Sequence, residues 1–386
     1  MKVLHIALSC FYVEGLGYQE NLLPKYHKLL GHDVTILTSE FSNSHLGTPK
    51  YLGLKEYDND NSIHVIKVER DELHFFGKEL QLNRYTGVYD AIDRVKPDVI
   101  FVHGLTSVAD IPIARYLKRH KNVMAYVDQH ADYYNSAINT AKLRILLHFV
   151  WRPVIHRLKN RVNKFWGTTP WRCQYLEEVY RLPKEKIGLL VMGADNRRID
   201  FAHQSAIRAE IRTELDLSED DFVVISGGKI DRAKNIHLLM QAVKSLNEEK
   251  LKLIVFGNVT EDMKEEIETL SADVHIRNIG WLDASKVYDY FLAADLAFFP
   301  GTHSVLWEQA CGCGIPCVFK KWDGMSHVSN GGNSVLMENV TADSIASVLR
   351  ELLADRERLR KMKRRAMSFK NEFLYEEIAK KAIEMR

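Results

Sequence analysis

The sequence predicts an α/β protein with two doubly wound parallel sheets that face a cleft. Three observations support this fold class. Short apolar or β-branched runs alternate with longer amphipathic runs, the alternation starts again near residue 221, and a length of 386 residues suits two domains better than one. A composition of 46% hydrophobic and 27% charged residues is that of a folded globular chain.

The first half of the chain alternates as expected for a parallel sheet that helices cover on both faces. Amphipathic patterns predict helices at residues 19–30, 85–95 and 107–119. Apolar runs predict strands at residues 2–8, 32–38, 64–67, 98–102 and 122–126.

The second half repeats the pattern after a strand at 187–191 and a hinge at Met192-Gly193-Ala194-Asp195. We therefore expect an N-terminal domain of residues 1–192 and a C-terminal domain of residues 193–369. The predicted strands are 221–226, 251–256, 274–279, 296–299 and 316–319. The predicted helices are 235–246, 261–270, 285–293, a helix start at 305–311, and most of 341–369.

Charge and cysteine content exclude several classes of protein. A net charge of +2 gives no general attraction to nucleic acid. Five cysteines, an odd number, indicate reduced thiols, and the spacing of Cys311, Cys313 and Cys317 does not fit a zinc Cys-x2-Cys pair. The apolar N-terminus is short and lacks the features of a signal peptide, and no run of about 18 apolar residues exists. We expect a cytoplasmic protein.

Functional side chains in parallel sheets follow the strand ends, where ligands bind. Gly15 and Gly17 stand there before the first helix, where glycine amides and a helix N-terminus favour an anion. Glu20 takes the place of the third glycine of G-x-G-x-x-G, so this is no dinucleotide fingerprint. An ordinary β–α turn is the alternative.

Histidines follow two other strands of the first half. His130 and Asp132 come after the strand that ends near residue 126, and His103 follows the strand 98–102. A histidine at the mouth of a sheet donates to developing negative charge or to a sugar hydroxyl. A histidine in a surface loop is the alternative.

The first strand of the second half leads into a basic glycine loop, residues 227–235. Gly227 and Gly228 allow a close approach, Lys229 and Lys234 are placed to neutralise a diphosphate, and Arg232 adds a bidentate donor. The alternative is a solvated basic loop.

Glu308 is a lone acid just past a strand end, in the run FFPGTHSVLWEQACGCGIPC. A carboxylate accepts two hydrogen bonds from a vicinal diol such as that of a ribose. The alternative is favourable charge at a helix N-terminus. A diphosphate loop and a diol-binding acid in one domain indicate a nucleoside diphosphate as ligand.

In order along the chain, these segments resemble the family 4 glycosyltransferases of the GT-B fold, which consists of two Rossmann-like domains. The family's Gly-Arg-Leu…Lys-Gly motif is similar to Gly228-Lys229-Ile230…Lys234-Asn235. Its Glu-Ala-Met-Ala-x-Gly-x-Pro-Val block is similar to the run from Glu308 to Pro316. The glycine loop at Gly15-Leu16-Gly17, the hinge and the AD-strand-Pro segment 294–300 match as well.

The resemblance implies a retaining, metal-independent transfer of a sugar from a UDP- or GDP-sugar held by the C-terminal domain. It implies that Lys229 and Lys234 hold the diphosphate, Glu308 the ribose, and that His130 lies near the donor sugar. It also implies a base contact by Gly280-Trp281-Leu282 and a C-terminal helix, about 370–386, that crosses back to the N-terminal domain. No cofactor and no metal are expected.

One departure from the family concerns the first acid of its Glu-x7-Glu pattern. Pro300 stands eight positions before Glu308, and residues 296–307 contain no acid. We expect the donor-sugar contact at Thr302, His303 and Ser304 instead.

The acceptor is expected to be a glycan or a lipid-diphosphate-linked sugar of bacterial surface polysaccharide synthesis. Residues 133–176 contain no acid, and 142–166 carry seven Lys or Arg and two Trp. Such a stretch suits the inner, anionic face of a cell membrane. The alternative is a helix pair packed on the N-terminal domain, which Pro153 breaks and whose basic residues are solvated.

Three other functions fit parts of the pattern. A nucleotide-sugar 2-epimerase uses the same architecture but wants more acids in the cleft. A dinucleotide oxidoreductase lacks its fingerprint here, and a non-catalytic sugar-nucleotide binder would fit the missing first acid.

Overall fold

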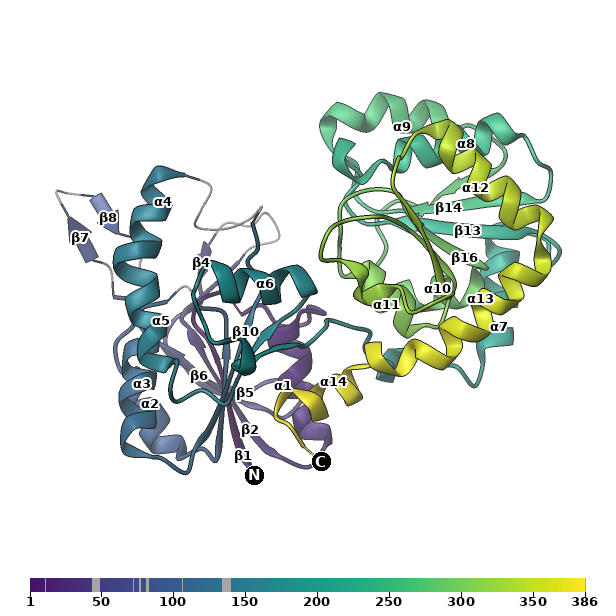
Figure 1. Cartoon of the computed structure of the whole chain (residues 1–386). Coiled ribbons are helices and arrows are strands. Elements are labelled where there is room, and N and C mark those ends of the chain that lie inside the picture. Colours follow the sequence, from purple (N-terminus) through teal and green to yellow (C-terminus); the bar gives the residue numbers. More distant parts are fainter. Residues whose placement is uncertain are drawn as a thin grey trace. The chain divides into compact units, whose positions relative to one another are not determined.

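The computed structural model describes residues 1–10, 12–43, 49–71, 73–75, 78–80, 83–105, 107–133 and 140–385. They form two compact units, residues 1–191 with 378–386 and residues 192–377. Each unit has its own sheet with helices on both faces (Figure 1). The predicted fold class, two Rossmann-like α/β domains, is confirmed.

The sheet of the first unit has the order β12-β11-β10-β9-β1-β2-β6-β5 and is parallel except for β5, which pairs antiparallel with β6. Its strands are β1 (Lys2–Ala7), β2 (Asp33–Ser39), β5 (Glu56–Asp58), β6 (His64–Val68), β9 (Val99–His103), β10 (Met124–Gln129), β11 (Lys164–Gly167) and β12 (Ile187–Leu189). Two small antiparallel hairpins lie outside this sheet: β3 (Phe41–Asn43) with β4 (Pro49–Tyr51), and β7 (Leu73–Phe75) with β8 (Lys78–Leu80).

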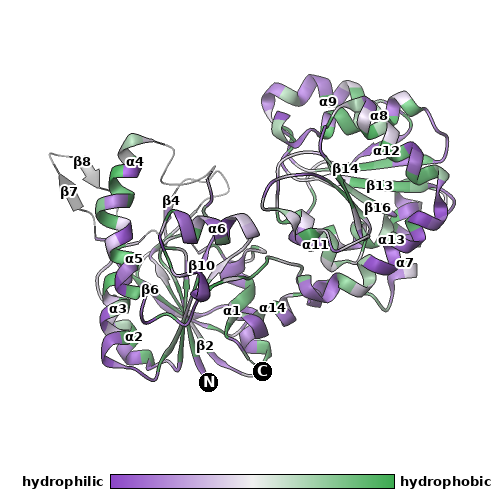
Figure 2. Ribbon diagram, viewed as in Figure 1, coloured by the Kyte–Doolittle hydropathy of each residue, from purple (hydrophilic) through white to green (hydrophobic). Residues whose placement is uncertain are grey.

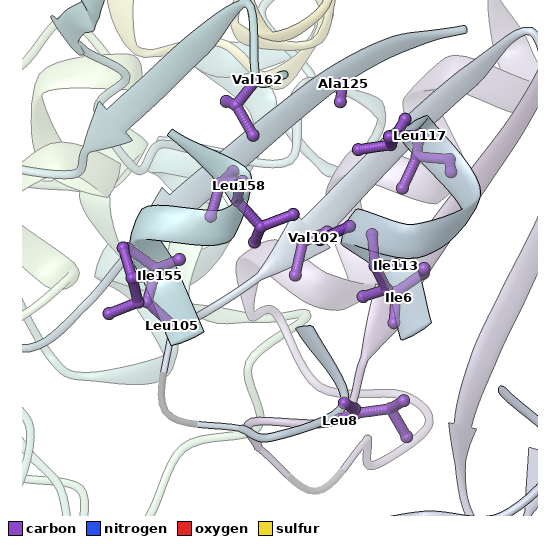
Figure 3. Packing of buried hydrophobic residues seen from close by; sticks show 14 of the residues in the cluster. Ile6, Leu8, Val102, Leu105, Ile113, Leu117, Ala125, Ile155, Leu158 and Val162 are labelled. Atoms are coloured by element: carbon purple, nitrogen blue, oxygen red, sulfur yellow. The ribbon is translucent and has the colours of Figure 1, made fainter. Parts of the chain in front are cut away.

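The helices of the first unit turn an apolar stripe toward the sheet and a polar face outward (Figure 2). Figure 3 shows Ile113 and Leu117 of one helix and Ile155 and Leu158 of another packed with Val102 of β9. These helices are α1 (Gln19–Leu29), α2 (Val88–Val95), α3 (Asp110–Arg119), α4 (Ala141–Leu146), α5 (Arg152–Leu158) and α6 (Pro170–Glu178).

Pro153 does not break the basic stretch into two helices, contrary to the alternative considered from the sequence. A π-helical segment, Leu147–Trp151, joins α4 to α5 without leaving helical backbone angles. Pro153 lies at the start of α5, directly after this segment. A wider π turn shifts the hydrogen-bond register, so the missing N–H of proline is tolerated there.

The sheet of the second unit is wholly parallel, with the order β15-β14-β13-β16-β17-β18. Its strands are β13 (Phe222–Gly227), β14 (Leu251–Phe256), β15 (Ile276–Asn278), β16 (Leu296–Phe299), β17 (Cys317–Lys320) and β18 (Ser334–Met337). Its helices are α7 (Gln204–Glu214), α8 (Ile236–Leu246), α9 (Lys264–Ser271), α10 (Val287–Ala293), α11 (Leu306–Gly312), α12 (Ala342–Ala354) and α13 (Arg356–Phe369).

The C-terminal segment links the two units. Helix α14 (Tyr375–Ala382) follows a 3-10 turn, Lys370–Phe373, and its end belongs to the first unit. There the Ala379 carbonyl lies 2.9 Å from a ring nitrogen of His27, and the Ala382 carbonyl accepts from Trp166 Nε1 at 3.0 Å. The part of this segment that groups with the first unit begins at Ile378.

Candidate functional site

The strand order of the second sheet reverses between β13 and β16, and this is where open parallel sheets bind ligands. The loops after these two strands meet there and line a small, partly open pocket. The pocket is lined by Ser226, Gly227, Lys234, Ile236, Phe299, Pro300, Gly301, Thr302, Ser304 and Trp307.

The two loops touch backbone to backbone, and Gly301 makes this possible. A Cβ on Gly301 would lie 2.3 Å from the backbone of Lys234. The Thr302 amide donates to the Ala233 carbonyl at 3.0 Å, and Asn235 Nδ2 donates to the Pro300 carbonyl at 3.1 Å. The loop that carries the cations is therefore fixed against the loop that carries Thr302.

Gly227 and Gly228 have structural reasons of their own to be glycine. A Cβ on Gly227 would lie 2.4 Å from the ring of Phe256. Gly228 has φ +112°, a conformation that side chains rarely adopt. Packing and backbone conformation alone therefore account for these two glycines, and close approach to a ligand stays a prediction.

Lys234 points its ammonium group along the pocket wall. Its Nζ donates to the carbonyl of Thr302 at 2.7 Å and to that of His303 at 3.0 Å. Burial lowers the pKa of Lys234. An ammonium has three N–H donors, so two fix the loop and the third is left for an anion.

The other two cations of the loop are more exposed than Lys234. Lys229 is 67% exposed and lies 3.6 Å from Asp231, while Arg232 is 60% exposed and pairs with Glu266 of α9 at 2.7 Å. Surface pairs of this kind are weak and exchange readily. Lys229 therefore has the freedom to reach an anion, whereas Arg232 would first leave Glu266.

Glu308 is completely buried, and it lies in the first turn of a helix, as the sequence predicts. It lies on α11, and both His303 Nε2 and His327 Nε2 lie 2.7 Å from its Oε1. Burial by itself raises the pKa of Glu308, but the two histidines outweigh it and hold the pKa well below the usual range. Glu308 is therefore ionised at neutral pH.

The second oxygen of this carboxylate is buried and lacks a donor in the part of the chain that the structure describes. Among the described residues, neither Glu308 Oε2 nor His327 Nδ1 has a hydrogen-bond partner. A buried acceptor without a partner costs about 1–3 kcal/mol, which a ligand hydroxyl would recover. His327, from the turn Ser326–Val328, is a residue that the sequence did not indicate.

Among the described residues, one group could also hold a metal ion. It consists of His303, Glu308 and His327, whose ring nitrogens and carboxylate oxygen lie within 4.8 Å of one another. Their 2.7 Å contacts are hydrogen-bond distances. Ligand atoms about 2.0–2.2 Å from a tetrahedral zinc would stand about 3.3 Å apart. The arrangement thus fits a hydrogen-bonded carboxylate better than a metal centre.

Trp281 follows the edge strand β15, which β14 separates from the pocket strand β13, and it is 64% exposed. Gly280 has φ +68°, and its carbonyl accepts from the Gly257 amide after β14. Leu282 is half-buried. An exposed aromatic ring at the binding edge of a sheet is suited to stack on a planar base.

In the first unit, Gly15 and Gly17 precede α1. Gly15 has φ +79°, which explains its glycine. A Cβ on Gly17 would meet nothing within 4 Å, and its φ lies outside the left-handed region. The fold does not require glycine at residue 17, so its approach to a ligand stays a prediction.

His130 follows β10 and its side chain is 37% exposed. Its Nε2 lies 3.4 Å from Oδ2 of the fully buried Asp128. Burial raises the pKa of Asp128, but His103 and His130 more than offset this and hold it well below its usual range. Asp132 pairs instead with Arg172 at 3.3 Å.

The cysteines beside Glu308 act as small apolar residues. Cys311, Cys313 and Cys317 are free and buried, and burial raises the pKa of the Cys311 and Cys313 thiols. Those two thiols stay protonated and are poor metal ligands.

Comparisons with known proteins agree with this geometry. Residues 207–369, most of the second unit, match the family model described as "Glycosyl transferases group 1". The lipopolysaccharide core biosynthesis glycosyltransferase LpsD of Rhizobium meliloti is 27% identical over 155 residues, which cover 38% of this chain and 45% of LpsD. The matches to such curated relatives span about half of their length or less.

Solved structures match along the whole chain. A glycosyltransferase from Rickettsia africae superposes with a TM-score of 0.72 at 14% identity, covering 100% of this chain and 97% of that one. The chain has the GT-B fold. Anabaena Alr3699/HepE, solved in complex with UDP, superposes with a TM-score of 0.70 at 15% identity, and the match covers 100% of this chain and 99% of that one.

Seen as a GT-B protein, the chain gathers several predicted residues at one site. Lys234, Thr302 and Ser304 line the pocket, whereas His303 and Glu308 do not line it but are next to the lining residues Thr302 and Trp307 in the chain. Gly280, Trp281 and Leu282 follow strand β15, two strands away from β13 at the edge of the same sheet, and do not line this pocket. Gly15, Gly17 and His130 belong to the other unit.

The Glu-to-Pro spacing of the family block also indicates a residue that was not among the predicted site residues. In the family block, Glu precedes Pro by seven positions. Counting back seven from Pro316 gives Gln309, whereas Glu308 is eight positions away. Gln309 is 9% exposed, against 0% for Glu308. The spacing was the available signal for Gln309 as a second candidate contact.

Proposed function

We propose that the protein is a glycosyltransferase that moves a sugar from a UDP- or GDP-sugar to a glycan or lipid-linked acceptor with retention of anomeric configuration. The pocket at the β13–β16 switch point carries the proposal, because Lys234 there presents a fixed cation beside Thr302 and Ser304. The group 1 family match and the UDP complex of the Anabaena protein support it.

The donor would bind in three parts. Lys234 and Lys229, with the backbone at Gly228, would hold the diphosphate. Trp281 would stack on the base, with Gly280 and Leu282 beside it. The buried Glu308 Oε2, which has no partner among the described residues, and the groups of Thr302, His303 and Ser304 would receive sugar or ribose hydroxyls.

Catalysis would rest on stabilising the leaving diphosphate. Its negative charge grows as the sugar departs, and a preorganised ammonium acts where that charge develops. The two carbonyls bonded to Lys234 fix the ammonium before the reaction, so little reorganisation is needed. By the family resemblance, His130 would meet the donor sugar and Gly17 the diphosphate.

A panel of labelled nucleotide sugars tests this function. With an acceptor present, a transferase releases nucleoside diphosphate and labels the acceptor. A 2-epimerase would instead return an epimerised sugar nucleotide. This alternative is kept because the chain superposes on a putative UDP-N-acetylglucosamine 2-epimerase from Listeria monocytogenes with a TM-score of 0.61. A non-catalytic binder would return the donor unchanged.

We also propose that the basic stretch contacts an anionic membrane, as a lipid-linked acceptor would require. Ile145 and Phe149 are 59% and 72% exposed and four residues apart, hence on one helix face. Arg144 and Arg157 are exposed cations of the same stretch. No helix among the described residues has the length and apolar character of a membrane span.

Vesicle flotation measures this contact. The protein is expected to float with vesicles of about 30% phosphatidylglycerol and not with pure phosphatidylcholine. Because inserting a phenylalanine contributes about 1.5–3 kcal/mol, Phe149→Ser should weaken binding about tenfold or more. Val274→Ser, which changes an equally exposed apolar residue of the second unit, is the matched control. Equal loss in both variants, or no binding to anionic vesicles, would contradict the contact.

A further inference from the structure

Three buried histidines of the first unit form a hydrogen-bonded series. His27 Nδ1 lies 2.9 Å from His5 Nε2, and His5 Nδ1 lies 3.0 Å from His103 Nε2. The series ends at the Ala379 carbonyl, 2.9 Å from His27 Nε2, and at Asp128 Oδ2, 3.0 Å from His103 Nδ1. All three rings are at most 2% exposed.

Both ends of the series require a hydrogen on the ring nitrogen that faces them. The Ala379 carbonyl only accepts, so His27 Nε2 carries a hydrogen. Asp128 is ionised, as its lowered pKa indicates, so its oxygen also only accepts and His103 Nδ1 carries a hydrogen.

Proton counting then gives the charge of the series. The two hydrogen bonds between rings need one hydrogen each, and so do the two terminal hydrogen bonds to Ala379 and Asp128. The series therefore needs four hydrogens on its ring nitrogens. Three neutral imidazoles carry three. Since an unmade hydrogen bond in a buried site is costly, the fourth hydrogen is present.

We infer that the His27–His5–His103 series stores one excess proton and that these histidines are positioning residues that neutralise Asp128 beside His130. The excess charge belongs on His103, which touches the Asp128 carboxylate, because a charge on His5 or His27 would lie one or two rings farther away.

The surroundings agree with this placement. Burial lowers the pKa of His5 well below its usual value and that of His27 to about 4. The other titratable groups that face the series are His32 beside His27, and His130 and Cys10 beside Asp128. Gln19 and the Gly104 amide add neutral donors to Asp128.

The consequence for His130 rests on the proposed function, whereas the proton count does not. His130 Nε2 faces the same Asp128 oxygen at 3.4 Å. With His103 as the counter-ion, His130 need not be charged. A neutral His130 then donates from Nε2 to Asp128.

Histidine-labelled protein and ¹⁵N–¹H correlation spectra near pH 7.5 test the count directly. One of the three rings should show the imidazolium pattern, and the other two should be neutral with hydrogen on Nε2. Loss of signals in His→Phe variants assigns each ring. Three neutral rings, or two charged ones, would overturn the inference, and this readout needs no activity.

The link to His130 has its own measurement. His5→Phe interrupts the series and should lower kcat about tenfold and displace its pH profile, with the KM for donor unchanged. His32→Phe, a neighbouring buried ring outside the series, should change neither. If the pH profile of His5→Phe were unaltered, the series would have no positioning role toward His130. The proton count would still be decided by the spectra alone.

Discussion

Replacing Lys234 by alanine is expected to lower kcat about 10²–10³-fold, the usual loss when a preorganised donor to a developing anion is removed. The substitution deletes the cation nearest the pocket and also frees the carbonyls of Thr302 and His303. KM for the donor should change less than kcat, because the charge on the diphosphate grows in the transition state.

Lys229→Ala is the matched control, since this lysine stands five residues earlier in the same loop but is largely exposed. We expect less than about a tenfold loss of kcat from it. Unchanged melting temperatures would show that both variants are folded. A Lys234→Ala enzyme with kcat within about threefold of wild type would refute the leaving-group role.

The second large effect is expected from Glu308→Ala. Removing the carboxylate leaves two buried imidazole N–H groups, on His303 and His327, without an acceptor. At about 1–3 kcal/mol each, the free energy of unfolding should fall by about 3 kcal/mol. Donor affinity should fall as well, because the unpartnered Oε2 acceptor proposed to bind a donor hydroxyl disappears.

The pH dependence of stability follows from the lowered pKa of Glu308. A carboxyl of the unfolded chain titrates near about 4.3, so the contribution of Glu308 is complete above that value and is lost as pH falls through its folded pKa. The free energy of unfolding, measured by urea titration at several pH values from about 6 down to about 3, should therefore fall more steeply for wild type than for Glu308→Ala. Asp128 keeps part of the slope in both proteins.

Glu266→Ala serves as the control, because it removes a carboxylate that pairs with the exposed Arg232. Its stability should change by less than about 1 kcal/mol. If Glu308→Ala left donor affinity unchanged while losing stability, the carboxylate would be purely structural. Gln309 would then be the next residue to examine as the hydroxyl contact.

Much of the fold could be predicted from the sequence. The central strands are apolar runs bounded by turn residues, and their alternation with helices permits few arrangements. The sequence patterns did not indicate strand β11, which lies within the acid-free stretch, or helix α6, which begins in it; both share its mixed composition. The π-helical joint before Pro153 leaves no pattern in the sequence.

The candidate site was predicted in its parts but not in its contacts. Lys234 and Glu308 were recognisable from local motifs. His327, which lies 19 residues after Glu308, reaches it only through the arrangement of the loops after β16 and β17. In the same way His5 and His27, on β1 and α1, meet His103 only through the strand order of the first sheet. Their signal was a polar residue within an apolar strand or on a buried helix face.

Sugar transfer from labelled nucleotide sugars tests the central claim most directly. Wild-type protein, supplied with UDP- and GDP-sugars and a polysaccharide or lipid-diphosphate acceptor, should release nucleoside diphosphate and label the acceptor in the donor's anomeric configuration. Lys234→Ala should abolish nearly all of this transfer. Tight binding of a nucleoside diphosphate without transfer to any acceptor, or transfer that survives in Lys234→Ala, would contradict the account.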